Sequence, residues 1–179
     1  MAKTFNINLP SFASAKSRAL QRSAIWDCLA PLTDNDDDLK QLKIEIVHMG
    51  NGRVRLGTGV AYRLVKRGVA SRSVEPLGLF LGIGKTELAK VLDLDRGTPA
   101  RLAAQNKPLP SHAGESVVRL LELESLASDV FESEDDAVNW LRKPHPMLDG
   151  DSPLEAAGSA FGTQRVKDIL LAIKYGAAV

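Results

Sequence analysis

The segment KTELAKVLDLDRGTPARLAAQN, residues 85–106, is the stretch of sequence that decides the fold. Apolar residues recur at helical spacing over 85–92, with the small Ala89 among them, which predicts a short, closely packed helix. Thr98-Pro99 has the residue types preferred at an N-cap and a first helical position, and predicts a second helix over 98–106. Two short helices joined by a tight turn are the plan of a helix-turn-helix, although ordinary helical proteins contain such hairpins too.

In a helix-turn-helix the second helix enters the major groove of DNA by its N-terminal end. Arginine binds guanine bidentately and glutamine binds adenine, whereas lysine and threonine suit phosphate oxygens. The predicted base-contacting residues are Arg96, Thr98, Arg101 and Gln105. The predicted phosphate-contacting residues are Lys85, Thr98 and Lys107.

The distribution of charge favours this interpretation over an ordinary hairpin. The formal net charge of +1 over 179 residues conceals an uneven sequence. Residues 40–110 carry 13 Lys/Arg and 5 Asp/Glu, a balance of +8, whereas residues 111–179 carry 6 and 12, a balance of −6. The helix pair lies in the basic segment, which phosphate attracts, and the acidic segment suits a basic partner surface. Surface charge also fluctuates along any chain, so the split alone does not decide.

Composition excludes several other classes of protein. Hydrophobic residues at 44% and charged residues at 25% are globular proportions. No apolar run approaches the roughly 20 residues that span a bilayer, and the N-terminal residues lack the apolar core of a signal peptide. The single cysteine, Cys28, cannot form an internal disulfide and can pack as a small apolar side chain. We therefore expect a cytoplasmic protein with no membrane partner.

Capping residues and prolines predict a mainly α-helical fold along most of the chain. We expect helices over 14–29, 60–67 ended by Gly68, and 74–81 capped by Ser73. The later helical signals are the stripe Leu120, Leu123, Ala127 and Val130, the cap at Ser133, the stop at Lys143-Pro144, the capping box Ser152–Glu155, and a last helix over 164–175 with Gly176 after it.

Pro108 and Pro110 mark the best domain boundary in the sequence. The predicted division is an N-terminal extension of unknown role over 1–58, a helix-turn-helix region over 59–110 and a C-terminal helical domain over 111–179.

The extension is ambiguous. Residues 39–56 fit a helix capped by Gly50 slightly better than a hairpin turning at 50–52. The acidic run 34–38 resembles the start of a calcium loop, but Leu39 occupies the position that requires glycine, so a solvated linker or helix start is the better interpretation.

No pattern of residues indicates an enzyme, a metal or a cofactor. Gly82–Thr86 ends like a phosphate-binding loop, but the motif needs glycine where Leu79 stands and a buried strand where a helix is predicted. His48, His112 and His145 lie far apart and have no metal-ligand spacing. We expect no catalytic residues.

The segment YGAAV, residues 175–179, allows two interpretations. Termini usually fray, and the sequence alone favours that outcome. A tail of small residues with a carboxylate could instead enter a narrow cleft of a partner.

The C-terminal third carries a more specific pattern. It consists of AVNWLRKP over 137–144, LDGDSPL over 148–154, then Gly162 and the last helix to Tyr175-Gly176. This pattern resembles the toxin-binding domain of Xre-type antitoxins, the Xre/MbcA/ParS group that partners RES-domain toxins. The helix pair before it is similar to the DNA-binding part of such proteins, so the resemblance covers about residues 59–179 and leaves the first 58 unmatched.

The resemblance implies a non-enzymatic antitoxin that places its C-terminal end at the active site of a toxin that consumes NAD, and that binds the promoter of its own operon as a homodimer. It assigns the toxin-binding role to Lys174, Tyr175, Gly176, Ala177, Ala178 and Val179, and DNA reading to the residues named above. It thereby reverses the preference for a frayed tail. The alternatives are a dimeric helix-turn-helix transcription regulator without a toxin and a small nucleotide hydrolase built around Lys85 and Thr86.

Overall fold

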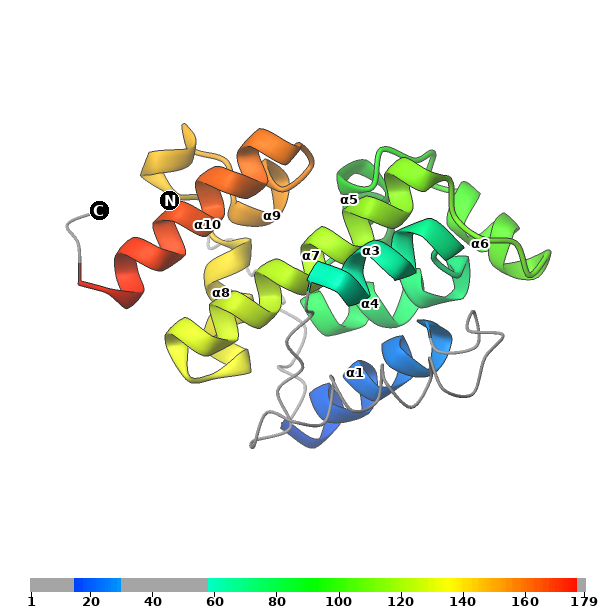
Figure 1. The fold of residues 1–179 in the computed structure, drawn as a ribbon, viewed down its shortest axis with the longest axis horizontal. Helices are drawn as coiled ribbons and strands as arrows, with labels where there is room; N and C mark the ends of the chain where they lie inside the picture. Colours follow the sequence, from blue (N-terminus) through cyan, green and yellow to red (C-terminus); the bar gives the residue numbers. More distant parts are fainter. Residues whose placement is uncertain (1–14, 30–57, 177–179) are drawn as a thin grey trace, which may run out of the picture.

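The computed structural model of the chain describes residues 15–29 and 58–176, and within these ranges the protein is helical, as predicted (Figure 1). The elements are α1 (Ala15–Leu29), α3 (Thr58–Arg67), the 3-10 turn η2 (Ser71–Ser73), α4 (Val74–Leu81), α5 (Lys85–Val91), α6 (Thr98–Ala104), α7 (Ser111–Phe131), α8 (Glu134–Arg142), the 3-10 turn η3 (Pro146–Leu148), α9 (Pro153–Ala156) and α10 (Ala160–Lys174). The β pairing recorded in these ranges is an isolated bridge between Ala70 and Pro108.

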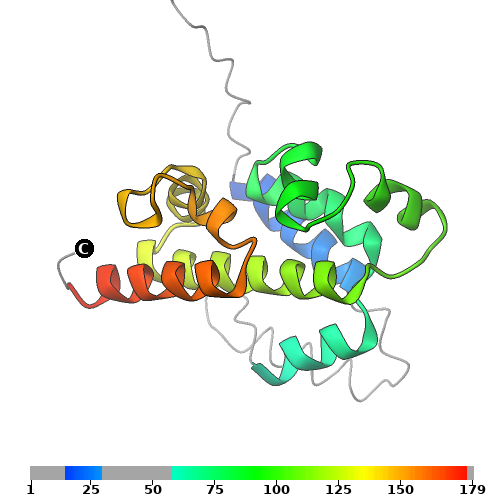
Figure 2. The ribbon, with the colours of Figure 1, turned by 90° about the horizontal axis from the view of Figure 1, so that it is seen from above.

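The 21-residue helix α7 is the central element of the fold. It packs against α3 on one side and against α8 and α10 on others, and Figure 2 shows α10 alongside its C-terminal half. Lys167 pairs with Glu122 at 3.1 Å and Lys174 pairs with Asp129. Both pairs join α10 to α7 and lie seven residues apart on each helix, so the two helices run parallel.

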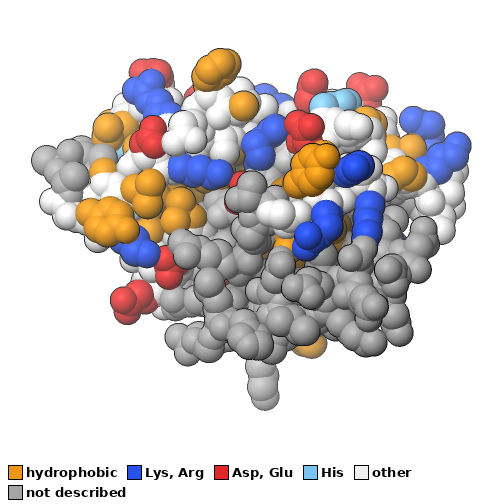
Figure 3. All heavy atoms as spheres, in the orientation of Figure 1, with side chains coloured by type: hydrophobic (Ala, Val, Ile, Leu, Met, Phe, Trp, Pro, Cys, Tyr) orange, Lys and Arg blue, Asp and Glu red, His pale blue; other side chains and the backbone are white. Residues whose placement is uncertain are grey.

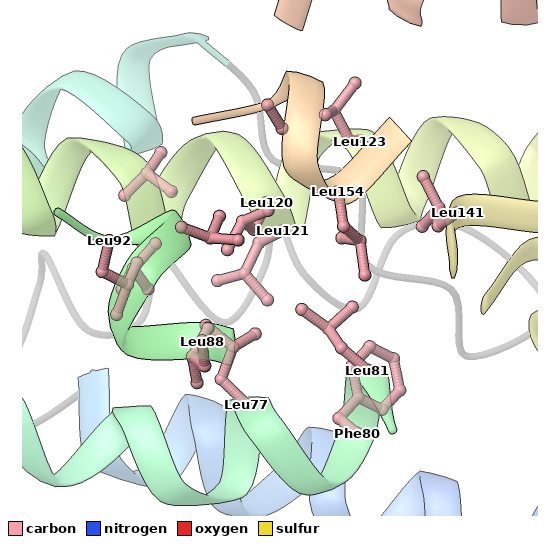
Figure 4. Packing of buried hydrophobic residues seen from close by; sticks show 14 of the residues in the cluster. Leu77, Phe80, Leu81, Leu88, Leu92, Leu120, Leu121, Leu123, Leu141 and Leu154 are labelled. Atoms are coloured by element: carbon pink, nitrogen blue, oxygen red, sulfur yellow. The ribbon is translucent and has the colours of Figure 1, made fainter. Parts of the chain in front are cut away.

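One hydrophobic core joins the elements before and after α7. Figure 4 shows its centre, where α4, α5, α7, α8 and α9 contribute Leu77, Phe80, Leu81, Leu88, Leu92, Leu120, Leu121, Leu123, Leu141 and Leu154. Helix α1 covers α4 and η2 from outside and buries Ile25 and Leu29. The boundary predicted at Pro108 and Pro110 falls just before α7, and apolar packing continues across it.

Several predicted helix ends are confirmed by the backbone. Gly68 ends α3 with φ +93°, and Lys143 ends α8 in extended conformation before proline. The hydroxyl oxygen of Ser133 accepts from the Asp136 amide at 3.2 Å. Ser152 and Glu155 form the reciprocal capping box, and the two hydrogen bonds from Ser152 lower the pKa of the Glu155 carboxyl.

Helix α4 spans Val74–Leu81 with Ser73 at its N-cap position, as predicted, but the Ser73 hydroxyl donates to the carbonyl of Ala70 at 2.7 Å and makes no capping bond. Two other predicted helix ends are wrong by a few residues. The N-cap of α6 is Gly97 rather than Thr98, and that helix ends at Ala104. Helix α10 starts at Ala160, capped by Ser159, four residues before the predicted start. The Ser159 hydroxyl oxygen accepts from the Gly162 amide at 3.0 Å, which starts α10 earlier than the pattern predicted.

The uncertain features of the N-terminal extension, namely the acidic run, residues 39–56 and His48, lie outside the described residues, as does the tail 177–179. None of the described helices combines the length and hydropathy needed to cross a bilayer.

Gly162 is required by close packing between α9 and α10. A Cβ atom there would lie 2.7 Å from the carbonyl carbon of Ala156 and closer still to its oxygen. At Gly59, in the first turn of α3, the nearest contact of a Cβ would be the end of the Arg63 side chain at 3.8 Å.

These two glycines give matched substitutions with opposite expected signs. Gly162→Ala should lower the free energy of unfolding by about 1–3 kcal/mol, because the backbone of α9 must move. Gly59→Ala should raise it by roughly 0.5–1 kcal/mol, because alanine is the better helix former. Urea unfolding followed by circular dichroism measures both, and equal effects would contradict the packing argument.

Candidate functional site

The predicted helix pair is present as α5 and α6, joined by a turn over residues 92–97. Leu88, Ala89 and Val91 are buried and fix α5 in the core. None of the residues of α6, all of them described, is fully buried. Helix α6 therefore projects from the body of the protein, as a DNA-reading helix must.

Hydrogen bonds to the segment just after its C-terminal end hold α6 in place. The Ser71 hydroxyl donates to the carbonyl of Lys107 at 2.6 Å, and the Leu109 amide donates to the carbonyl of Val69 at 2.8 Å. The bridge between Ala70 and Pro108 lies between these bonds. This part of the chain is tied to η2, whereas the N-terminal end of α6 extends outward.

The predicted base-contacting residues of α6 lie on its outer face. Thr98, Arg101 and Gln105 follow each other at intervals of three and four, which places them on one side of a helix. Arg101 and Gln105 are exposed and Thr98 is half-buried. Arg96, in the turn, and Lys107, after the helix, are exposed as well.

The inner face of α6 borders an apolar cavity of about 210 Å³ between α4, α5 and α6, with Pro99, Ala100 and Ala103 in its wall. Lys85 and Arg96 also line it. The ammonium of Lys85 lies 3.0 Å from the Glu75 carboxylate, and both side chains are largely exposed. An exposed pair of this kind contributes little stability, so a phosphate can replace Glu75 as the partner of Lys85.

The basic character predicted from composition is divided between two faces. Figure 3 shows Lys and Arg side chains over α3 and over α6. Figure 2 places α3 on the side of α7 opposite to α4 and α5, so its cations do not add to the α6 surface. Residues 71–107, which hold the helix pair, carry only 6 Lys/Arg against 4 Asp/Glu. Electrostatic attraction of DNA to this site would therefore depend on the positions of its Lys and Arg side chains and not on the net charge of the segment.

Sequence reasoning missed the exposed end of α3. Tyr62 is 65% exposed, and the ammonium of Lys66 lies 5.8 Å from the centre of its ring. Lys66 and Arg67 occupy the last turn of that helix. The signal was present in the spacing of Tyr62 and Lys66, four residues apart, which brings an aromatic ring and a cation together on one face.

The predicted toxin-contacting residues lie at the end of α10, far from α6 along the long axis of the molecule (Figure 1). Lys174 is paired with Asp129 on α7, so its ammonium is turned toward the body of the protein. Tyr175 is 78% exposed, and Gly176 adopts φ +69°, which turns the chain out of the helix. Of the six predicted residues the structure describes these three.

The turn around Gly82 does not have the context of a phosphate loop. The element before it is the helix α4, as predicted, and Gly82 ends that helix with φ +64°. A Cβ on Gly82 would lie 3.1 Å from a guanidinium nitrogen of Arg142. The turn therefore packs against α8, and Lys85 begins a helix at its edge.

The remaining candidates for chemistry have structural explanations. The thiol of Cys28 is half-buried and donates to the carbonyl of Arg72 at 3.7 Å, and burial raises the pKa of this thiol, which favours the unreactive form. The Nδ1 atom of His145 accepts from the Met147 amide at 3.2 Å. Across residues 15–29 and 58–176 no three His, Cys, Asp or Glu side chains are grouped as a metal site would require.

Two family models match the chain from α3 to the end of α10. Residues 60–122 match the antitoxin Xre-like helix-turn-helix domain, and residues 126–176 match the antitoxin Xre/MbcA/ParS C-terminal toxin-binding domain. The chain is also 28% identical over 123 residues to the Prs ADP-ribosylating antitoxin of Sphingobium sp. (strain YBL2). That alignment covers 64% of this chain and 77% of the relative.

The geometry at Gly82 predicts that the protein binds no nucleoside triphosphate. Isothermal titration calorimetry with ATP or GTP in the presence of Mg²⁺ should show no saturable binding, because a helix precedes the glycines and the turn packs against Arg142. Saturable binding that disappears in Lys85→Ala would contradict this and restore the phosphate-loop interpretation.

Proposed function

This chain belongs to the Xre/MbcA/ParS-type antitoxins, and from that premise we propose that it neutralises a RES-type, NAD-consuming toxin and represses its own operon. The observation that carries the proposal is the separation of two exposed sites. Helix α6, with Arg101 and Gln105 exposed, lies at one end of the molecule, and the C-terminal end of α10 lies at the other. A single chain can therefore bind DNA and toxin at the same time.

The toxin half of the proposal rests on the end of α10. Tyr175 and Gly176 lead outward into small residues, which fit a narrow catalytic cleft better than bulky ones would. A cleft that binds NAD must attract its pyrophosphate and is therefore electropositive, which suits the acidic balance of residues 111–179. The relative's name refers to ADP-ribosylation, a reaction that takes ADP-ribose from NAD, and this supports an NAD-consuming toxin for the present chain.

The DNA half rests on the outer face of α6. In this proposal Arg96, Arg101 and Gln105 contact base edges, and Lys85 and Lys107 contact phosphates. Thr98, half-buried at the start of the helix, contributes to either class through its hydroxyl. A homodimer supplies two such helices for the half-sites of an operator, and the complex acts in the cytoplasm, where the operon DNA lies.

Replacing Arg101 tests the DNA half. Arg101→Ala should weaken operator binding by about 1–3 kcal/mol and relax the preference at one base position, because a bidentate contact is lost. Arg165→Ala removes the same charge from the exposed surface of α10 and should leave the affinity unchanged. Fluorescence anisotropy with promoter DNA measures both variants, and equal losses would mean that Arg101 acts only through its charge.

Deleting residues 176–179 tests the toxin half. The truncated protein should bind the operator normally but fail to suppress NAD consumption by the toxin encoded in the adjacent reading frame. An NAD hydrolysis assay at saturating antitoxin gives the result. Full neutralisation by the truncated protein would show that the tail is not the inhibitory element, and the absence of any neutralisation by the full chain would favour a transcription regulator without a toxin.

A further inference from the structure

Helix α10 carries more of the exposed large hydrophobic side chains than any other described element. Among the described residues seven such side chains are exposed, and three of them, Phe161, Leu171 and Tyr175, belong to this helix or its C-cap. Phe161 is 90% exposed, more than any other large hydrophobic side chain among the described residues. In Figure 3 orange side chains gather over the C-terminal end of α10. Apolar side chains grouped in this way mark a surface that meets another molecule.

The exposed residues form one continuous stripe. At about 100° per residue, positions 161, 164, 168, 171 and 175 fall within an arc of about 80°, at the intervals of three and four that form a helix-packing seam. We call this stripe, made of Phe161, Gln164, Asp168, Leu171 and Tyr175, the α10 seam. At 1.5 Å per residue it is about 21 Å long.

The opposite face of α10 is fixed in the protein. Val166, Ile169 and Leu170 are buried against the core, and Lys167 and Lys174 pair with carboxylates of α7 on the flank. These contacts set both the position and the rotation of the helix. The α10 seam is therefore presented as a rigid surface, which lowers the entropy that a partner must overcome on binding.

The charge at the centre of the seam argues against a second copy of this chain as its occupant. Asp168 lies midway between Phe161 and Tyr175 and accepts a hydrogen bond from the Gln164 amide at 2.8 Å. A two-fold pairing that covered the whole seam, parallel or antiparallel, would place Asp168 against Asp168. Burying two facing carboxylates is costly, whereas a partner with a cation at that point would be favoured.

We propose that the α10 seam is the surface on which the toxin docks, with Phe161 as the anchor in an apolar pocket and Asp168 facing a toxin cation. The inference rests on the proposed function and assigns affinity for the toxin and inhibition of the toxin to different parts of the chain. The seam supplies affinity, and the segment after Gly176 supplies inhibition. The seam ends at Tyr175, so the docked surface leads directly into that segment.

The experiment measures affinity and inhibition separately, with the toxin of the adjacent reading frame as the probe. Phe161→Ala should weaken the complex by about 30-fold or more, as truncation of an aromatic hot spot does, yet inhibit NAD consumption fully at saturating concentration. Asp168→Lys should weaken it by about tenfold and reduce the dependence of the affinity on salt concentration. Leu20→Ala, which removes a side chain 72% exposed on α1, is the control and should change neither quantity.

The outcomes distinguish this inference from the proposed function. Normal affinity of Phe161→Ala would overturn the docking seam, while loss of inhibition on deleting 176–179 would still support the tail. Loss of affinity in Phe161→Ala with full inhibition by the deletion variant would support the seam and overturn the tail. Conversion of the antitoxin from dimer to monomer by Phe161→Ala, measured by light scattering, would identify the seam as a self-interface and overturn the proposal. Operator binding by each variant confirms that it is folded.

Discussion

The fold depends on the packing of a single helix, α7, whose buried residues serve both functional halves. Val117 and Leu120 lie in the half that follows the helix-turn-helix elements, and Leu123 and Ala127 lie in the half that contacts α8 and α10. The two family matches end and begin at residues 122 and 126, inside this continuous helix. Because one core contains both halves, the outer face of α6 and the exposed end of α10, which are the proposed DNA and toxin surfaces, keep a fixed relative position.

Close approaches extend this connection to the surroundings of α5. The Arg142 side chain of α8 lies next to Gly82, which ends α4 just before α5, and a Cβ added to Gly158, after α9, would lie 4.0 Å from the Val91 carbonyl oxygen at the end of α5. The C-terminal half therefore lies near both ends of the helix that precedes α6. Toxin binding changes DNA affinity only if the complex prefers one arrangement of these contacts, since a ligand shifts an equilibrium by its differential affinity for the two states. A rigid core without such alternative arrangements favours additive binding of the two partners.

The sequence predicted what depends on local chemistry and missed what depends on distant neighbours. Ser133 and Ser152 cap helices as predicted, because their partners lie three residues away. Ser73 stands at the predicted N-cap position of α4 but makes no capping bond, because its hydroxyl donates instead to the Ala70 carbonyl in a turn that the pattern did not contain. The summed charge of residues 40–110 also misled, since the fold places α3 and α6 on different sides of α7. The exposure of Phe161 could not be read from its residue type, which predicts burial; only the rotation of α10, set by Val166 and Leu170, turns it outward.

The geometry of α10 connects the proposed docking surface to the proposed inhibitory segment. Three residues span at most about 10 Å, so residues 177–179 reach an active site only if its mouth is held close to Tyr175. Small side chains bury too little surface to provide that positioning, because tight association needs large, well-packed side chains. In the proposed mode of binding a rigid surface next to Gly176 has to place these residues, and on the described part of the chain the face of α10 that ends at Tyr175 meets this requirement.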